Sequence, residues 1–360
     1  MAKGDKLKSE PKIYKDEKTG REVWRMTSWD RANCVATYFY SRAFSGDERY
    51  IIFTSDRAGK FELYRLEIEN GETIQLTDNF SQRNLLSFNV HPDGREVFYH
   101  GENAIYAVDI ESGEERPVAD LSDKPWGSIY GGPSISGDGK KVVCQYKHKK
   151  GGAGIAMAET KGSSFEDLYK CDKLLSHVQI NPGDNPIISF NILPDQQNIP
   201  DLPPHERARA WKLDLNTGET VPFLVMPPGF RATHEYWSPK GGRLYFHKKT
   251  VPTWTPTSIA SISVDGDDFR EHFISETRKL GHSCIDPHGR IIVSDVQEPH
   301  TNELIAIDLD TGASEVLCWP NSSVGNGQLG HVHPSSSFSG KKVLYTSDVT
   351  GKAQVYMVSL

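Results

Sequence analysis

The amino-acid sequence predicts an all-β protein, a seven-bladed β-propeller with four antiparallel strands in each blade. Three observations carry this prediction. A short turn containing Gly or Pro recurs seven times, β-rich segments follow each turn, and the two ends of the chain read as parts of one blade. Repeats of roughly 40–50 residues, each supplying four strands, are typical of propeller blades.

The repeated turn has Gly or Pro at its second position. That residue falls at positions 46, 92, 137, 182, 239, 287 and 340, so that neighbouring turns lie 45 to 57 residues apart. Two stacked β-sandwiches, the alternative all-β arrangement, do not explain seven phased repeats.

Each turn is followed by an apolar run that is typical of a buried or half-buried strand. These runs cover residues 50–53, 96–99, 141–144, 186–190, 243–246, 290–293 and 342–345. A second alternating run, a Gly-containing hairpin turn such as Asn70-Gly71-Glu72 and a last strand complete the unit. Glycine adopts the positive φ that such tight turns require.

The two ends of the chain complement each other. The seventh repeat reaches Leu360 after its third strand, and residues 18–28 read as the missing turn and fourth strand. We therefore expect a single propeller domain over residues 1–360, with residues 1–17 as an N-terminal arm and residues 18–28 completing the seventh blade. Closure of this kind protects sheet edges.

Composition limits the functional classes. The chain carries 48 acidic and 41 basic residues, a net charge of −7, which excludes a broadly basic surface for nucleic acid. No apolar run approaches the 18 residues of a membrane span, and the charged start of the chain does not read as a secretory signal. Five cysteines without a Cys-x-x-Cys pair favour a reduced, cytoplasmic protein without a disulfide framework.

Histidines recur at one position of the repeat. Counting back five residues from the second position of the turn gives His177, His234 and His282 in three consecutive blades, and His331 and His333 lie slightly earlier in the seventh. In a propeller these positions lie on the innermost strands, which line the central channel. Neutral imidazoles suit a transition metal, although a polar lining of the channel is the competing interpretation.

The segment Gln328-Leu329-Gly330-His331-Val332-His333 is the strongest part of this pattern. His-x-His on a strand places both rings on one face, because side chains alternate with period two. An oxygen ligand from Gln328 would suit a harder ion such as Mn²⁺.

Other patterns are weaker. Residues 325–330 match Gly-x-Gly-x-x-Gly, but no helix is expected to follow, so a dinucleotide site is not predicted. The aromatic residues Trp126, Trp237, Trp254 and Tyr38-Phe39-Tyr40 are candidates to stack on a sugar ring, with blade packing as the alternative for each. Residues 191–207 are an insertion that forms either a lid or a surface excursion.

Over most of its length the chain resembles the oligogalacturonate lyases, polysaccharide lyase family 22, and the histidine positions are part of this resemblance. The Arg-x-Trp element of that family is similar to Arg209-Ala210-Trp211, and its Thr-His-Glu-aromatic-Trp element to residues 233–237, with the same 25-residue spacing from Arg209 to His234. The family holds a manganese ion with three histidines and one glutamine. The matching positions are His282, Gln328, His331 and His333.

The chain departs from the family pattern at two places. Val35-Ala36-Thr37 stands where the family commonly has His-Arg before its Tyr-Phe-Tyr, and Phe190-Asn191-Ile192-Leu193 stands where it has Cys-His-Glu-Gly. The resemblance places these differences at the rim that contacts the sugar, so they bear on the exact substrate.

The resemblance implies a cytoplasmic enzyme that cleaves short pectin-derived oligogalacturonates by β-elimination to 4,5-unsaturated products. In this interpretation Mn²⁺ neutralises the uronate carboxylate, His234 removes the C5 proton, and Arg209 pairs with a carboxylate or keeps His234 neutral. His177, Tyr38, Tyr40 and Trp237 are the candidate substrate-binding residues. The expected partner is an acidic oligosaccharide, with no nucleic acid and no membrane.

Two alternatives remain open from the sequence. One is a lyase for another uronate glycan, and the other is a non-catalytic, TolB-like propeller that binds sugar or protein.

Overall fold

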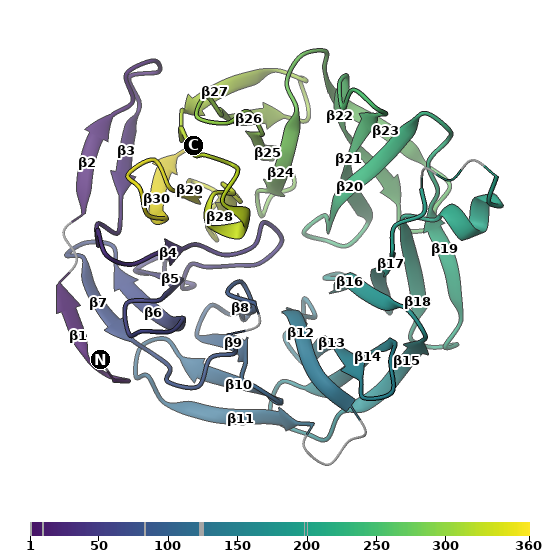
Figure 1. Ribbon diagram of the computed structural model, residues 1–360, viewed down its shortest axis with the longest axis horizontal. Helices are drawn as coiled ribbons and strands as arrows, with labels where there is room; N and C mark the ends of the chain where they lie inside the picture. The colour runs from purple at the N-terminus through teal and green to yellow at the C-terminus, as the bar shows by residue number, and fades with distance from the viewer. Residues whose placement is uncertain (1, 9–10, 83, 122–125, 198, 200) are drawn as a thin grey trace. The chain divides into compact units, whose positions relative to one another are not determined.

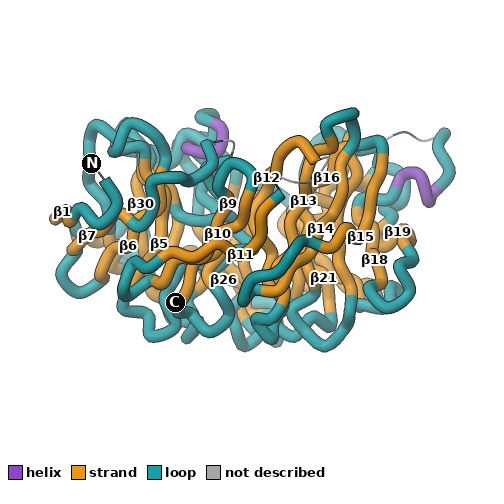
Figure 2. The backbone as a smooth tube through the Cα atoms, turned by 90° about the horizontal axis from the view of Figure 1, so that it is seen from below, coloured by secondary structure: helices purple, strands orange, loops and turns teal. Residues whose placement is uncertain are grey.

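The structure is a computed structural model that describes residues 2–8, 11–82, 84–121, 126–197, 199 and 201–360. Within this part of the chain the secondary structure is almost entirely β, with two short 3₁₀ helices, η1 (Pro204–Arg207) and η2 (Gly327–Leu329) (Figure 2). None of the described helices is long and apolar enough to cross a membrane. All five cysteines are free, and four of them are buried.

The described strands form seven antiparallel sheets, five with four strands and two with five (Figure 1). This is the blade arrangement of the predicted seven-bladed β-propeller. The chain divides into two compact units, one of residues 1–101, 107–116 and 280–360 and one of residues 102–106 and 117–279. The prediction of a single domain over residues 1–360 stays a prediction.

The first unit holds three complete sheets. Their strands are, in spatial order, β1 (Lys6–Lys8), β7 (Glu72–Gln75), β6 (Glu62–Glu67), β5 (Tyr50–Ser55) and β4 (Cys34–Val35); β24 (Leu280–Ile285), β25 (Ile291–Val296), β26 (Leu304–Asp308) and β27 (Ser314–Cys318); and β2 (Lys12–Lys15), β3 (Glu22–Arg25), β30 (Gln354–Ser359), β29 (Lys342–Ser347) and β28 (Ser335–Ser336). A further sheet has residues in both units and consists of β8 (Phe88–Val90), β9 (Glu96–His100), β10 (Ala104–Asp109) and β11 (Glu115–Asp120).

The second unit holds the remaining three sheets. Their strands are β12 (Trp126–Ile135), β13 (Lys141–His148), β14 (Ala153–Glu159) and β15 (Glu166–Cys171); β16 (Leu174–Ile180), β17 (Ile187–Leu193), β18 (Ala210–Asp214) and β19 (Thr220–Leu224); and β20 (Phe230–Trp237), β21 (Arg243–Thr250), β22 (Thr257–Ser263) and β23 (Phe269–Ser275). The runs expected after the repeated turns coincide with β5, β9, β13, β17, β21, β25 and β29.

The N-terminal strand closes the seventh blade as predicted. β3 pairs antiparallel with β30, with Val23 opposite Val358 and Arg25 opposite Tyr356, so that segments from the two ends of the chain lie side by side (Figure 1). The arm before β3 adds two edge strands that the sequence did not predict. β2 pairs with β3, and β1 pairs with β7 in another blade.

The first strands of four blades contain a β-bulge at the repeated histidine position. In β16 and β20 the register shifts after Ser176 and after Thr233, and similar shifts occur in β12 and β24. His177 and His234 lie directly within these shifts and have positive φ values of 50° and 57°. Because a bulge places two residues opposite one, it turns side chains away from the regular alternation of the strand.

Candidate functional site

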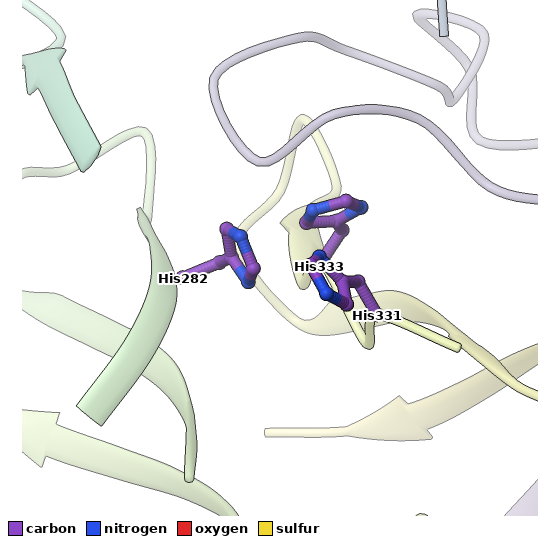
Figure 3. A group of neighbouring side chains, drawn as sticks. All are labelled: His282, His331 and His333. Carbon is purple, nitrogen blue, oxygen red and sulfur yellow. The ribbon is translucent and has the colours of Figure 1, made fainter. Parts of the chain in front are cut away.

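Three histidines of the first compact unit form a cluster. His282 projects from β24, and His331 and His333 lie in the loop that leads into β28 (Figure 3). One nitrogen of each ring lies within 4.8 Å of the others. The ring centroids of His282 and His333 are 4.1 Å apart, and both lie 5.2–5.4 Å from that of His331.

The His-x-His pair does not lie on a strand, contrary to expectation. Residues 331–334 are irregular, β28 begins only at Ser335, and His333 has a φ of 44°. The two rings nevertheless point toward the same place, because the left-handed backbone at His333 replaces the alternation of a strand.

The buried ring of His333 fits a metal ligand. It is inaccessible to solvent, and neither of its nitrogens has a hydrogen-bond partner within the described part of the chain. Nδ1 of His331 is likewise buried without a partner. Buried polar atoms are nearly always satisfied, so these nitrogens call for a group such as a metal ion. Burial, and then the neighbouring His282 and His331, hold the pKa of His333 well below its ordinary value, which keeps the ring in the neutral form that binds metals.

Asp295 orients the third ring of the cluster. Its Oδ2 lies 3.2 Å from Nδ1 of His282, and its Oδ1 accepts a hydrogen bond from the backbone N–H of His282. Gly281 permits this approach, because a Cβ atom there would lie 2.3 Å from Oδ1 of Asp295. With the carboxylate on Nδ1, Nε2 of His282 is the nitrogen that could hold a metal, an arrangement common around protein metals.

Aromatic residues pack against the cluster. The ring of Tyr38 lies 4.8 Å from that of His333, and the ring of Phe39 lies 5.5 Å from that of His282. Tyr40 stands edge-on to Tyr38 at 4.8 Å. The structure therefore brings Tyr38 and Phe39 to the predicted metal ligands, and Tyr40, which like Tyr38 is partly exposed, packs on Tyr38.

The loop before His331 is anchored by Asp348. Its carboxylate accepts hydrogen bonds from the hydroxyls of Ser322 and Ser323, at 2.9 and 2.5 Å, and from the backbone N–H of Ser323. The Ser322 hydroxyl also lies 2.7 Å from the carbonyl oxygen of Gly330. Gln328 lies between these anchors in η2, with an exposed side chain, and its role as a ligand stays a prediction.

A second group of predicted residues meets in the other compact unit. Nε and Nη2 of Arg209 bind the two carboxylate oxygens of Glu235 at 2.6 and 3.2 Å, and Nη1 binds Asp195 at 2.9 Å. Nδ1 of His177 lies 3.0 Å from Oε2 of Glu235, and Asn191 donates to the same oxygen at 3.0 Å. The sequence analysis missed Asp195 and Glu235 as partners, although Glu235 directly follows His234 in the quoted motif.

This group is charged despite its burial. Burial opposes the ionised form of Glu235, but Arg209 and His177 outweigh it and hold the pKa of this carboxyl well below its ordinary value. Burial likewise opposes the charge of Arg209, and Glu235 and Asp195 raise its pKa in spite of that. Arg209 thus has three of its five donors engaged by protein carboxylates.

His234 lies beside this network and is partly exposed. Its ring centroid is 5.8 Å from that of the buried His247 and 6.4 Å from that of His177. The bulge in β20 lets two consecutive side chains make different contacts. Glu235 binds Arg209, while the ring of His234 lies near His177 and His247.

Three groups of residues that were expected at the sugar-binding surface are instead buried or bind other residues of the protein. Trp237 is only 7% exposed and stacks on Phe223 in the core of its blade, which favours the packing alternative. Residues 35–37 are fully buried, so they do not form an exposed rim. In the other departure from the family pattern, Phe190 is buried and Asn191 binds Glu235. In the insertion 191–207, residues 198 and 200 lie outside the described residues.

Sequence comparison assigns the chain to a family. A family model described as oligogalacturonate lyase matches residues 1–302. The chain belongs to the oligogalacturonate lyase family. Membership makes it a lyase of pectin-derived oligosaccharides. The matched region includes Arg209, His234 and His282 and ends before His331 and His333.

Individual oligogalacturonate lyases are similar over the whole chain. An oligogalacturonate lyase of Dickeya dadantii is 24% identical, over 100% of this chain and 98% of its own length. Among solved structures, an oligogalacturonate lyase in complex with manganese has a TM-score of 0.87 at 22% identity, covering 100% of this chain and 98% of that one. An oligogalacturonate lyase from Vibrio parahaemolyticus has a TM-score of 0.86 at 22% identity, covering 99% and 98%. These likenesses confirm the seven-bladed propeller fold.

Proposed function

We propose that the protein is a metal-dependent lyase that cleaves short oligogalacturonates by β-elimination and leaves a 4,5-unsaturated uronate. The observation that carries the metal requirement is the buried His333, whose two ring nitrogens have no hydrogen-bond partner within the described residues while His282 and His331 converge on the same point. The similar lyase solved with manganese supports Mn²⁺ as the ion.

The metal site consists of His282, His331 and His333, with Gln328 as the proposed fourth ligand. Bound there, Mn²⁺ supplies positive charge that neutralises the uronate carboxylate and stabilises the enolate-like transition state. Asp295 fixes the His282 ring, and Asp348 fixes the loop that carries the other two histidines. Tyr38 and Tyr40 supply aromatic surface for the sugar beside these ligands.

The base is His234. A neutral imidazole is well matched to proton abstraction near pH 7. One of its ring nitrogens takes the proton from C5, the electrons of that C–H bond form the C4–C5 double bond, and the C4–O4 bond breaks as O4 takes a proton from water. The buried network of Arg209, Glu235 and His177 holds the strand on which His234 lies.

The test is a panel of short uronate oligosaccharides, followed by the ultraviolet absorbance of the unsaturated product, with chelator and with added Mn²⁺. We expect product from oligogalacturonates only in the presence of metal. Equal rates in chelator would overturn the metal requirement. Product from none of the uronates would favour a binding propeller of the TolB-like kind.

A lyase for a different uronate glycan is the second candidate. Asn191, which stands at a departure from the family pattern, contacts the same oxygen of Glu235 as His177 does. A different neighbour for this carboxylate would alter the shape of the sugar-binding surface. The same panel separates the two candidates by the uronate that reacts fastest.

A further inference from the structure

An exposed tryptophan stands in the loop between β21 and β22. The side chain of Trp254 is 42% exposed, and its φ of 69° lies in the left-handed region, which a bulky residue rarely adopts. The loop is well ordered by internal hydrogen bonds. Trp254 N donates to the Thr250 carbonyl at 2.9 Å, and the Thr253 hydroxyl donates to the Thr255 carbonyl at 2.7 Å. A large apolar ring is thus held at the surface on a strained backbone, a combination that is common at binding sites.

Two cations lie over the ring of Trp254. The guanidinium carbon of Arg231 is 5.9 Å from the ring centroid, and the ammonium of Lys249 is 4.8 Å from it. The two residues face each other across the register of β20 and β21. Such contacts orient the ring and place positive charge beside it.

Asp195 connects Arg231, one of these two cations, to the buried network around Arg209. Asp195 is shared, since one of its oxygens binds Arg231 at 2.8 Å and Arg209 at 2.9 Å. Lys249, which is 2% exposed, adds a second positive charge beside the Trp254 ring. The Nε of Arg231 is also buried without a hydrogen-bond partner within the described residues. These groups favour an anionic ligand.

We propose that Trp254, Arg231 and Lys249 form a binding site for a further uronate residue of an acidic oligosaccharide, next to the residue that reacts. The apolar face of the sugar stacks on Trp254, and its carboxylate is attracted by the two cations. The inference rests on the proposed function, since it extends the same substrate by one sugar. Arg231 links this site to the buried network through Asp195.

Calorimetric titration of the full-length protein tests the proposal, with chelator present so that no turnover occurs. The ligands are galacturonate, trigalacturonate and a neutral galactose trimer. We expect Trp254→Ala and Arg231→Gln each to weaken trigalacturonate binding about tenfold, Trp254→Phe to weaken it less, and monomer binding to stay unchanged. Trp29→Ala is the matched control, because Trp29 is 39% exposed beneath Arg57 at 5.4 Å and should bind as the wild type does.

The outcomes separate the two proposals. If the wild type binds trigalacturonate and both Trp254→Ala and Arg231→Gln bind it equally well, the site does not exist, although the proposed function stands. If the neutral trimer binds as tightly as the acidic one, the role of the cations is overturned. If the wild type binds no uronate and makes no unsaturated product, the proposed function fails, and this inference fails with it. Far-ultraviolet circular dichroism checks that each variant is folded.

Discussion

Arg209 and Glu235 form a buried two-pronged ion pair, with Nε–Oε1 and Nη2–Oε2 distances of 2.6 and 3.2 Å. Glu235 is 2% exposed, and His177 and Asn191 occupy its second oxygen. The pair holds β20 at its bulge, directly after His234. Removing one partner of a buried pair leaves an uncompensated charge, which costs far more than losing a surface pair.

Glu235→Gln should therefore destabilise the fold by about 3 kcal/mol. The measurement is the free energy of unfolding from urea titration. Glu271→Gln is the control, since Glu271 pairs with Lys248 at 3.0 Å on the surface, and it should cost less than about 1 kcal/mol. Similar losses of unfolding free energy in the two variants would show that the buried ion pair stabilises the fold no more than the surface pair does.

The same carboxylate predicts a pH dependence of stability. The pKa of Glu235 is held well below its ordinary value in the folded state, so the folded state favours the ionised form. The stabilisation is complete above the ordinary glutamate pKa of about 4.3 and is lost as the pH falls toward the folded-state pKa. Unfolding titrations between pH 6 and pH 3 should show a smaller loss of stability for Glu235→Gln than for the wild type. Equal losses of stability in the two proteins as the pH falls would show that the ion pair of Glu235 is not the source of the pH dependence.

The histidine cluster predicts a specific loss of metal. His333→Ala should abolish binding of Mn²⁺ and remove the rise in melting temperature that the metal gives the wild type. Elemental analysis of the purified protein gives the metal content, and thermal unfolding gives the shift. His205→Ala, at an exposed histidine, is the control and should keep both. Retention of metal by His333→Ala would refute the assignment.

Asp295 and Asp348 are expected to act on the metal through its ligands. Asp295→Asn should weaken metal affinity about 10–100-fold, because it loosens the His282 ring, and Asp348→Asn should weaken it by releasing the loop before His331. Competition with a fluorescent chelator measures the affinity. Asp310→Asn, at a surface carboxylate paired with Arg290, should have no effect. Unchanged affinity in both variants would limit these residues to a structural role.

His234→Ala separates the base from the metal. If His234 removes the proton, the variant should keep its full metal content and lose turnover by at least about 100-fold. A parallel loss of metal would instead make His234 a ligand. His272→Ala is the control, since His272 binds Ser261 within its own blade at 2.7 Å.

The sequence predicted the blades well because each rests on local signals. Alternation and glycine turns located the second strand of every blade. The incomplete first and last repeats predicted that residues 18–28 complete the seventh blade, where Val23 pairs with Val358. The histidines were found because they recur near one position of the same repeat. The networks around the histidines could not be predicted in this way, because the ion pair of Glu235 with Arg209 depends on a bulge in β20 and on packing between strands, which periodicity does not record. Periodicity also could not decide the role of Trp237, because an aromatic residue at that position fits both a sugar-stacking surface and the hydrophobic core in which it lies.

The most direct test of a metal-dependent lyase is a titration of metal-free protein with Mn²⁺, in which bound metal and the initial rate of unsaturated-uronate formation are measured on the same samples. The account predicts that the rate rises in proportion to bound metal and saturates at about one ion per chain, as expected for one three-histidine site. A full rate in the metal-free protein, or metal bound without any gain in rate, would contradict it.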